Sequence, residues 1–155
     1  MYERDLIAFI DLERTIIPDW ENRFLINAQS IRKFLKDRQI SEIGIFSFAI
    51  YNEDDKRDFE SNIKPMIETA LDVNVVQWPS VIDMIRINTT NWNPRMANVG
   101  EFIKTNTKDN AFSRYVQKTC QFKTAILIDD MVSDLTIEHR HKHWVIELWN
   151  VDSLS

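Results

Sequence analysis

Short apolar runs that end abruptly in carboxylates or a hydroxyl constrain the fold of this chain more than any other feature. Uninterrupted apolar runs bounded by polar residues are typical of strands buried on both faces of a parallel sheet. The carboxyl ends of parallel strands meet at one edge of the sheet, where ligands bind in open α/β sheets. The three runs and the polar residues that follow them are 7–10 with Asp11 and Glu13, 43–46 with Ser47, and 125–128 with Asp129 and Asp130.

Segments with helical periodicity separate these runs, and the alternation of strands with helices predicts the fold class. Such alternation implies an α/β fold, in which a mostly parallel sheet has helices on both faces. We therefore predict a Rossmann-like three-layer sandwich with about five strands. Pro65 lies inside one predicted helix, where it either kinks that helix or starts a new one. The predicted strands are 6–11, 43–49, 73–78, 124–128 and 143–149, and the predicted helices are 27–38, 54–71, 81–85, 96–104 and 109–119.

The composition predicts a folded domain that does not span a membrane. The chain has 155 residues, of which 44% are hydrophobic, so we expect a single domain, 1–155, without a cap domain. The net charge of −5 gives no general attraction to nucleic acid or to an anionic membrane. A single cysteine, Cys120, and the lack of a signal-peptide pattern favour a cytoplasmic location. The presence of only two glycines excludes a glycine-rich phosphate loop.

The acidic ends of the first and fourth predicted strands indicate a cation site. Neighbouring carboxylates repel each other unless a cation is present, and Mg²⁺ takes oxygen ligands while it bridges to phosphate. A second carboxylate two residues beyond the first can act as acid and base toward a leaving group. A hydroxyl such as that of Ser47 can bond a phosphoryl oxygen, and a lysine can neutralise its charge. The pattern therefore favours Mg²⁺-dependent chemistry on a phosphorylated substrate.

These residues and their order resemble the motifs of the haloacid-dehalogenase (HAD) superfamily of phosphotransferases, and the strand–helix pattern is similar over nearly the whole chain. The segment Asp-Leu-Glu-Arg-Thr at 11–15 resembles the first motif of the family, Asp-x-Asp-x-Thr. Ser47 resembles the second motif, a Thr or Ser at a strand end. Asp129 and Asp130, with Asp134, resemble the fourth, acidic motif.

The third motif of the family is a lysine near the start of the helix before the fourth strand. Lys108, just ahead of Asp109, fits this position best, and Lys104 fits second. Lys118 and Lys123 lie too late in the chain.

The resemblance implies a small, capless HAD-like phosphohydrolase that depends on Mg²⁺ and hydrolyses phosphomonoesters through an aspartyl-phosphate. An open site of this kind would suit large phosphorylated substrates, such as phosphoproteins or nucleic-acid ends. The implied roles are nucleophile for Asp11, acid and base for Glu13, Mg²⁺ ligands for Asp11, Glu13, Asp129 and Asp130, and phosphate binding for Ser47 and Lys108.

Two departures from the first motif favour a different function. Glu13 stands where the family usually has aspartate, and an extra methylene moves the carboxyl by about an ångström, which can cost roughly 100-fold in rate. Arg14 replaces the usual small residue. We therefore expect weak phosphatase activity. The alternative is a catalytically inactive HAD-like scaffold or regulator that binds a protein partner, because fold alone does not decide function.

Two other interpretations fit the sequence less well. A response-regulator receiver also places carboxylates, a hydroxyl and a lysine around Mg²⁺, but its acidic pair follows the first strand, whereas here the pair follows the fourth. His139, His141 and His143 would share one side of an extended segment, as zinc ligands might. The charges interleaved with these histidines favour a solvated turn before the last strand instead.

Overall fold

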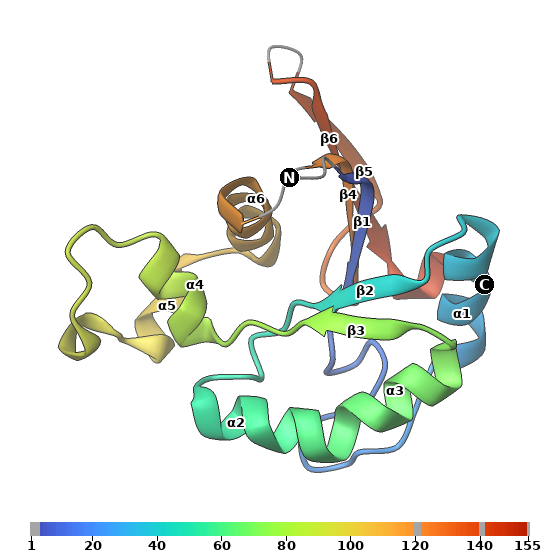
Figure 1. Cartoon of the computed structure of the whole chain (residues 1–155), viewed down its shortest axis with the longest axis horizontal. Coiled ribbons are helices and arrows are strands. Elements are labelled where there is room, and N and C mark those ends of the chain that lie inside the picture. The colour runs from blue at the N-terminus through green and yellow to red at the C-terminus, as the bar shows by residue number, and fades with distance from the viewer. Residues whose placement is uncertain (1–3, 120–121, 140–141, 155) are drawn as a thin grey trace.

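The computed structural model is built on one six-stranded sheet with the strand order β3-β2-β1-β4-β6-β5 (Figure 1). The structure describes residues 4–119, 122–139 and 142–154. All neighbouring strands are parallel except β5, which pairs antiparallel with β6. The strands are β1 (Arg4–Ile10), β2 (Glu42–Ile45), β3 (Asn74–Gln77), β4 (Phe122–Asp129), β5 (Leu135–His139) and β6 (Trp144–Asn150). The predicted α/β sandwich with a mostly parallel sheet is confirmed.

Helices cover both faces of the sheet, as Figure 1 shows: α1 and α3 lie over one face, and α4, α5 and α6 lie over the other. Within the described ranges, no helix is long and apolar enough to cross a membrane. The helices are α1 (Ala28–Asp37), α2 (Glu53–Asp58), α3 (Lys64–Leu71), α4 (Val81–Ile87), α5 (Val99–Thr105) and α6 (Lys108–Thr119), with a π-helical turn at Phe59–Ile63 and 3-10 turns at Pro94–Met96 and Val151–Leu154.

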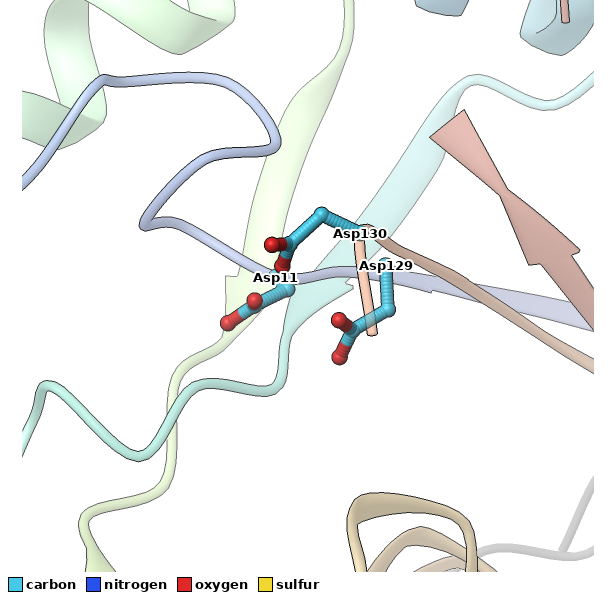
Figure 2. A group of neighbouring side chains, drawn as sticks. All are labelled: Asp11, Asp129 and Asp130. Carbon is cyan, nitrogen blue, oxygen red and sulfur yellow. The ribbon is translucent and has the colours of Figure 1, made fainter. Parts of the chain in front are cut away.

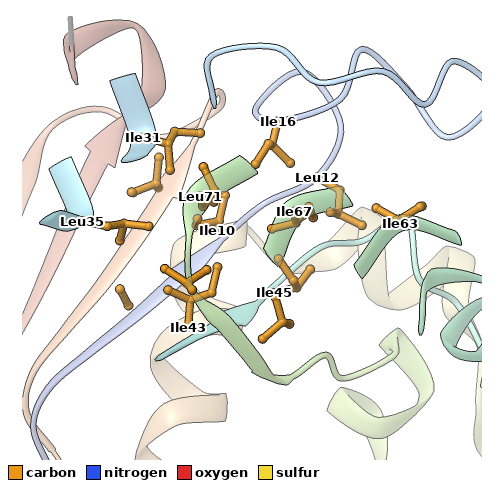
Figure 3. Packing of buried hydrophobic residues seen from close by; sticks show 14 of the residues in the cluster. Ile10, Leu12, Ile16, Ile31, Leu35, Ile43, Ile45, Ile63, Ile67 and Leu71 are labelled. Atoms are coloured by element: carbon orange, nitrogen blue, oxygen red, sulfur yellow. The ribbon is translucent and has the colours of Figure 1, made fainter. Parts of the chain in front are cut away.

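The central strand β1 buries side chains on both of its faces, which explains its uninterrupted apolar sequence. Ala8 and Ile10 belong to the core cluster beneath α1 and α3, and Figure 3 shows Ile10 among the isoleucine and leucine side chains of those helices. Ile7 and Phe9 belong to the second cluster, beneath α6. On β2, Gly44 leaves the space that the Phe9 ring occupies, because a Cβ at position 44 would overlap that ring.

The strand β5 is the main departure from the predicted elements. The interpretation of the segment around His139 as a solvated turn is wrong at that residue, because His139 is the last residue of β5. His143 lies in the turn before β6, and His141 lies outside the described residues. β5 occupies an edge of the sheet and most of its side chains are exposed, so its five residues carry no continuous apolar run that would reveal a strand.

The predicted helix 54–71 is divided into three parts. α2 ends at Asp58, the π-helical turn follows, and α3 begins at Lys64. Pro65 lies in the first turn of α3, directly after the π-helical turn. The backbone stays right-handed helical at the junction residues Ile63 and Lys64, so Pro65 does not start a separate helix, and the distortion ahead of it is the π-helical turn.

Candidate active site

The strands β1 and β4 bring their terminal carboxylates together. The two strands are parallel neighbours in register, with Ile10 opposite Ile128. The backbone N–H of Asp11 continues this pairing by donating to the carbonyl oxygen of Ile128 at 2.9 Å, and Asp129 is the last residue of β4. In the sheet, β2 lies on one side of β1 and β4 lies on the other, so the strand order changes direction at β1. Ligands bind outside strand ends at such a switch point in open α/β sheets.

Lys108, the first residue of α6, connects these two carboxylates. Its Nζ lies 3.0 Å from Asp11 Oδ1 and 3.2 Å from Asp129 Oδ2. The side chains of Lys108, Asp11 and Asp129 are only 13%, 7% and 0% exposed. The ring of Phe48 also contacts the ammonium group, with its centroid 4.6 Å from Nζ. Buried charges are tolerated where they are paired in this way, and one lysine between two carboxylates leaves an excess of negative charge.

The electrostatic environment raises the pKa values of Asp11, Lys108 and Asp130. Burial raises the pKa of Asp11 from 3.8 to about 6, although the charge of Lys108 opposes the rise. Burial acts to lower the pKa of Lys108, but the charges of Asp11 and Asp129 outweigh burial and raise it above its usual value. Burial, together with hydrogen bonding to Asp129 and the charge of Asp129, raises the pKa of Asp130. All three shifts follow from acidic groups packed closely in a poorly solvated site.

Three carboxylates form a group that could hold a metal ion. Oxygen atoms of Asp11, Asp129 and Asp130 lie within 4.8 Å of one another, and Figure 2 shows the three side chains gathered at the ends of β1 and β4. Asp129 is the most constrained member, because its Oδ1 accepts a hydrogen bond from the backbone N–H of Met131 at 2.8 Å while its Oδ2 faces Lys108. Carboxylate oxygens are the ligands that Mg²⁺ takes, so the residues fit this ion.

The backbone places Ser47 at the same edge of the sheet as the cluster. β2 ends at Ile45, four residues before the predicted end, but its pairing continues because the backbone N–H of Phe46 donates to the carbonyl oxygen of Ile10 at 3.0 Å. Because Ile10 lies opposite Ile45, Asp11 is level with Phe46, and Ser47 lies one residue further along at the same edge of the sheet. Its side chain is buried, and Oγ accepts a hydrogen bond from the backbone N–H of Ala49 at 3.1 Å; no acceptor for its hydroxyl hydrogen is found among the described residues.

Glu13 is the predicted site residue whose carboxylate the structure places elsewhere. Its Oε2 accepts a hydrogen bond from the backbone N–H of Trp20 at 2.9 Å, and within the described part of the chain its carboxylate is not in the acidic group around Asp11. The loop that joins Glu13 to Trp20 begins with a tight turn, in which the carbonyl oxygen of Leu12 accepts hydrogen bonds from the backbone N–H groups of residues 15, 16 and 17. Arg14 adopts a left-handed conformation, with φ of 59°, and is exposed.

Asp134, grouped with the fourth motif in the sequence, supports the site from outside it. Its Oδ1 accepts the backbone N–H of Asn150 at 2.7 Å. The amide of Asn150 in turn donates to the carbonyl oxygens of Asp130 and Val132, at 3.1 and 2.9 Å. These bonds fix the loop that carries Asp130. The sequence carries no signal for the roles of Asn150 or Phe48, because both depend on contacts between distant segments.

Comparisons of the chain with models of protein families, with curated proteins and with solved structures give no match.

Proposed function

We propose that this protein is a HAD-like, Mg²⁺-dependent phosphohydrolase that cleaves phosphomonoesters through an aspartyl-phosphate on Asp11. The observation that carries the proposal is the position of Lys108, which contacts both Asp11 and Asp129 in one buried cluster at the switch point of the sheet. An isolated acidic strand end is often only the start of a loop. A lysine from a separate helix, buried between two such ends, makes a site that can bind an anion and a cation together.

The side chains divide the reaction between them. An oxygen of Asp11 attacks the phosphorus, and the bond from phosphorus to the ester oxygen breaks as that oxygen takes a proton from Glu13. Water then gives a proton to the Glu13 carboxylate and attacks the phosphorus of the aspartyl-phosphate, the bond from phosphorus to Asp11 breaks, and phosphate is released with Asp11 and Glu13 both restored. Lys108 and the hydroxyl of Ser47 hold the phosphoryl oxygens throughout. When bound by Asp11, Asp129 and Asp130, with the backbone carbonyl of Glu13, Mg²⁺ supplies further neutralisation of phosphate charge.

The position of Glu13 favours a second candidate, a catalytically inactive HAD-like scaffold or regulator. Because its carboxylate accepts the Trp20 N–H, proton transfer to a leaving group requires that hydrogen bond to break or to be shared. In this second candidate the same sheet edge binds a protein partner without turnover. As part of the first proposal, the phosphohydrolase acts in the cytoplasm on a large phosphorylated substrate at an open site.

Hydrolysis of an aryl phosphate with and without Mg²⁺ distinguishes the two candidates. We expect slow turnover by the wild type, loss of turnover with EDTA, and no turnover by Asp11→Asn, because an amide cannot act as the nucleophile. Asp54→Asn is the matched control, since Asp54 is exposed and pairs with Arg57, three residues along the same helix. A folded wild type that is inactive with Mg²⁺, or an active Asp11→Asn variant, contradicts the phosphohydrolase.

A further inference from the structure

A groove with four apolar side chains in its lining adjoins the candidate site at Lys108. It has a volume of about 410 Å³, within the range of small-molecule sites. We call it the side groove. It is lined by Lys108 from α6, Met131 and Val132 from the loop after β4, Leu135 from β5 and Leu148 from β6, and its three remaining lining residues, Thr107, Asp109 and Ser133, are polar. Lys108 therefore lines the side groove while its ammonium group contacts Asp11.

The exposure of two apolar side chains marks the side groove as a binding surface. Met131 is 76% exposed and Leu135 is 52% exposed, so two of the five large apolar side chains that remain exposed in the described ranges flank this one groove. Single exposed apolar residues are ordinary, whereas a cluster of them beside a cleft indicates a ligand site. Leu148 and Val132 are buried and form the floor. An apolar group that entered the groove would cover surface that the fold leaves in water.

The hydrogen bond of Glu13 independently restricts the leaving group. With its carboxylate engaged by the Trp20 N–H, protonation of the leaving oxygen receives less help. General acid help is worth about 100- to 10,000-fold. A phenol, with a pKa of about 10, leaves with far less help than an aliphatic alcohol, whose pKa is closer to that of water, about 15.7.

We infer that the side groove receives the aromatic ring of an aryl phosphate whose phosphoryl group lies at Asp11 and Lys108. This inference rests on the proposed function and adds the substrate class to it. Met131 suits the role, because its flexible thioether adapts to a ring and makes favourable contacts at the ring edge. The four apolar side chains favour a ring over a sugar, whose hydroxyls would lose hydrogen bonds to water against them. Two sources share this chemistry: a small aryl phosphate and a phosphotyrosyl side chain.

Non-reacting phosphonates separate ring binding from the intrinsic reactivity of aryl esters. We expect benzylphosphonate to inhibit hydrolysis about tenfold more strongly than methylphosphonate, which corresponds to burial of part of one ring. Met131→Ser and Leu135→Ser should each reduce this ratio severalfold without changing inhibition by methylphosphonate. Phe24→Ser is the matched control, because Phe24 is equally exposed apolar surface outside the groove.

The outcomes distinguish failure of the inference from failure of the proposed function. Hydrolysis with equal inhibition by both phosphonates overturns the inference that the side groove receives the ring, but it leaves the phosphohydrolase proposal standing. The same holds if the inhibition ratio is unchanged in both groove variants. Absence of both hydrolysis and phosphonate binding overturns both. A higher kcat/KM for a phosphotyrosyl peptide than for phenyl phosphate would identify a protein substrate, and equal values would identify a small one; both results support the aryl class.

Discussion

Replacing Lys108 with methionine tests the electrostatic account of the candidate site most directly. The substitution keeps the apolar stem of the side chain and removes its charge from between Asp11 and Asp129. At 3.0 and 3.2 Å, with an effective dielectric constant of about 20, each contact contributes roughly 5 kcal/mol of attraction before desolvation is subtracted. Removing one partner of a buried ion pair typically costs about 3–5 kcal/mol. We therefore expect the free energy of unfolding of Lys108→Met to fall by about that amount at pH 8.

The loss of unfolding free energy caused by Lys108→Met should become larger as pH rises from 5 to 8. In the wild type the pKa of Asp11 is about 6, above its ordinary value of 3.8, so between these values the native state binds more protons and stability falls as pH rises. Loss of Lys108 removes a charge that lowers the pKa of Asp11, so in the variant this pKa is higher and stability continues to fall with rising pH above pH 6. Each additional proton adds a slope of about 1.4 kcal/mol per pH unit. The variant should accordingly be closest to the wild type at pH 5.

Urea unfolding at pH 5, 6, 7 and 8, with EDTA present, measures this dependence. Lys104→Met is the matched control, because Lys104 is an exposed lysine in the preceding helix, four residues from Lys108. The control should lose less than about 0.5 kcal/mol at every pH. The reasoning is refuted if the two variants are equally stable at pH 8, or if Lys108→Met becomes more stable relative to the wild type as pH rises.

Three further predictions concern the metal ion, the acid and the core. Mg²⁺ at ten times its Kd should stabilise the wild type by about 1.4 kcal/mol in thermal melting, and Asp130→Ala should abolish the shift; a shift that survives contradicts the site. Glu13→Asp should raise phosphatase activity, because a shorter stem brings the position closer to the usual motif; lower activity in a kinetic assay would show that the glutamate is already the working acid. Gly44→Ala should cost about 1–3 kcal/mol in urea unfolding, because its Cβ meets the ring of Phe9; an unchanged midpoint would show that the ring moves freely.

The elements that the sequence predicted well are those with a strong local pattern. β1 and β4 are buried on both faces, so their apolar runs identify them, and their parallel pairing follows from the helices between them. The meeting of Asp11 and Asp129 then follows from topology alone. The prediction of Lys108 rests on resemblance to a motif, and the structure places its ammonium group beside Asp11 and Asp129.

The features that the sequence did not predict depend on contacts between distant segments. β5 has an exposed face and only five residues, so hydrophobic periodicity does not distinguish it from a turn. The partner of the Glu13 carboxylate depends on the path of the loop as far as Trp20, which no local preference determines. The contact of Phe48 with Lys108 likewise requires the position of α6 relative to the end of β2.

The central place of β1 in the sheet has a consequence for how the chain folds during synthesis. β2 and β3 follow β1 closely along the chain and can pair with it or with each other early, but β4 begins only at Phe122. Until then one edge of a strand that is apolar from Leu6 to Ile10 has no hydrogen-bonding neighbour. Such an open edge is a template for pairing with another chain, and contacts distant in sequence form slowly. The nascent chain is therefore most prone to aggregate while residues before 122 emerge from the ribosome, and completion of β4 closes that edge and assembles the acidic cluster in the same step.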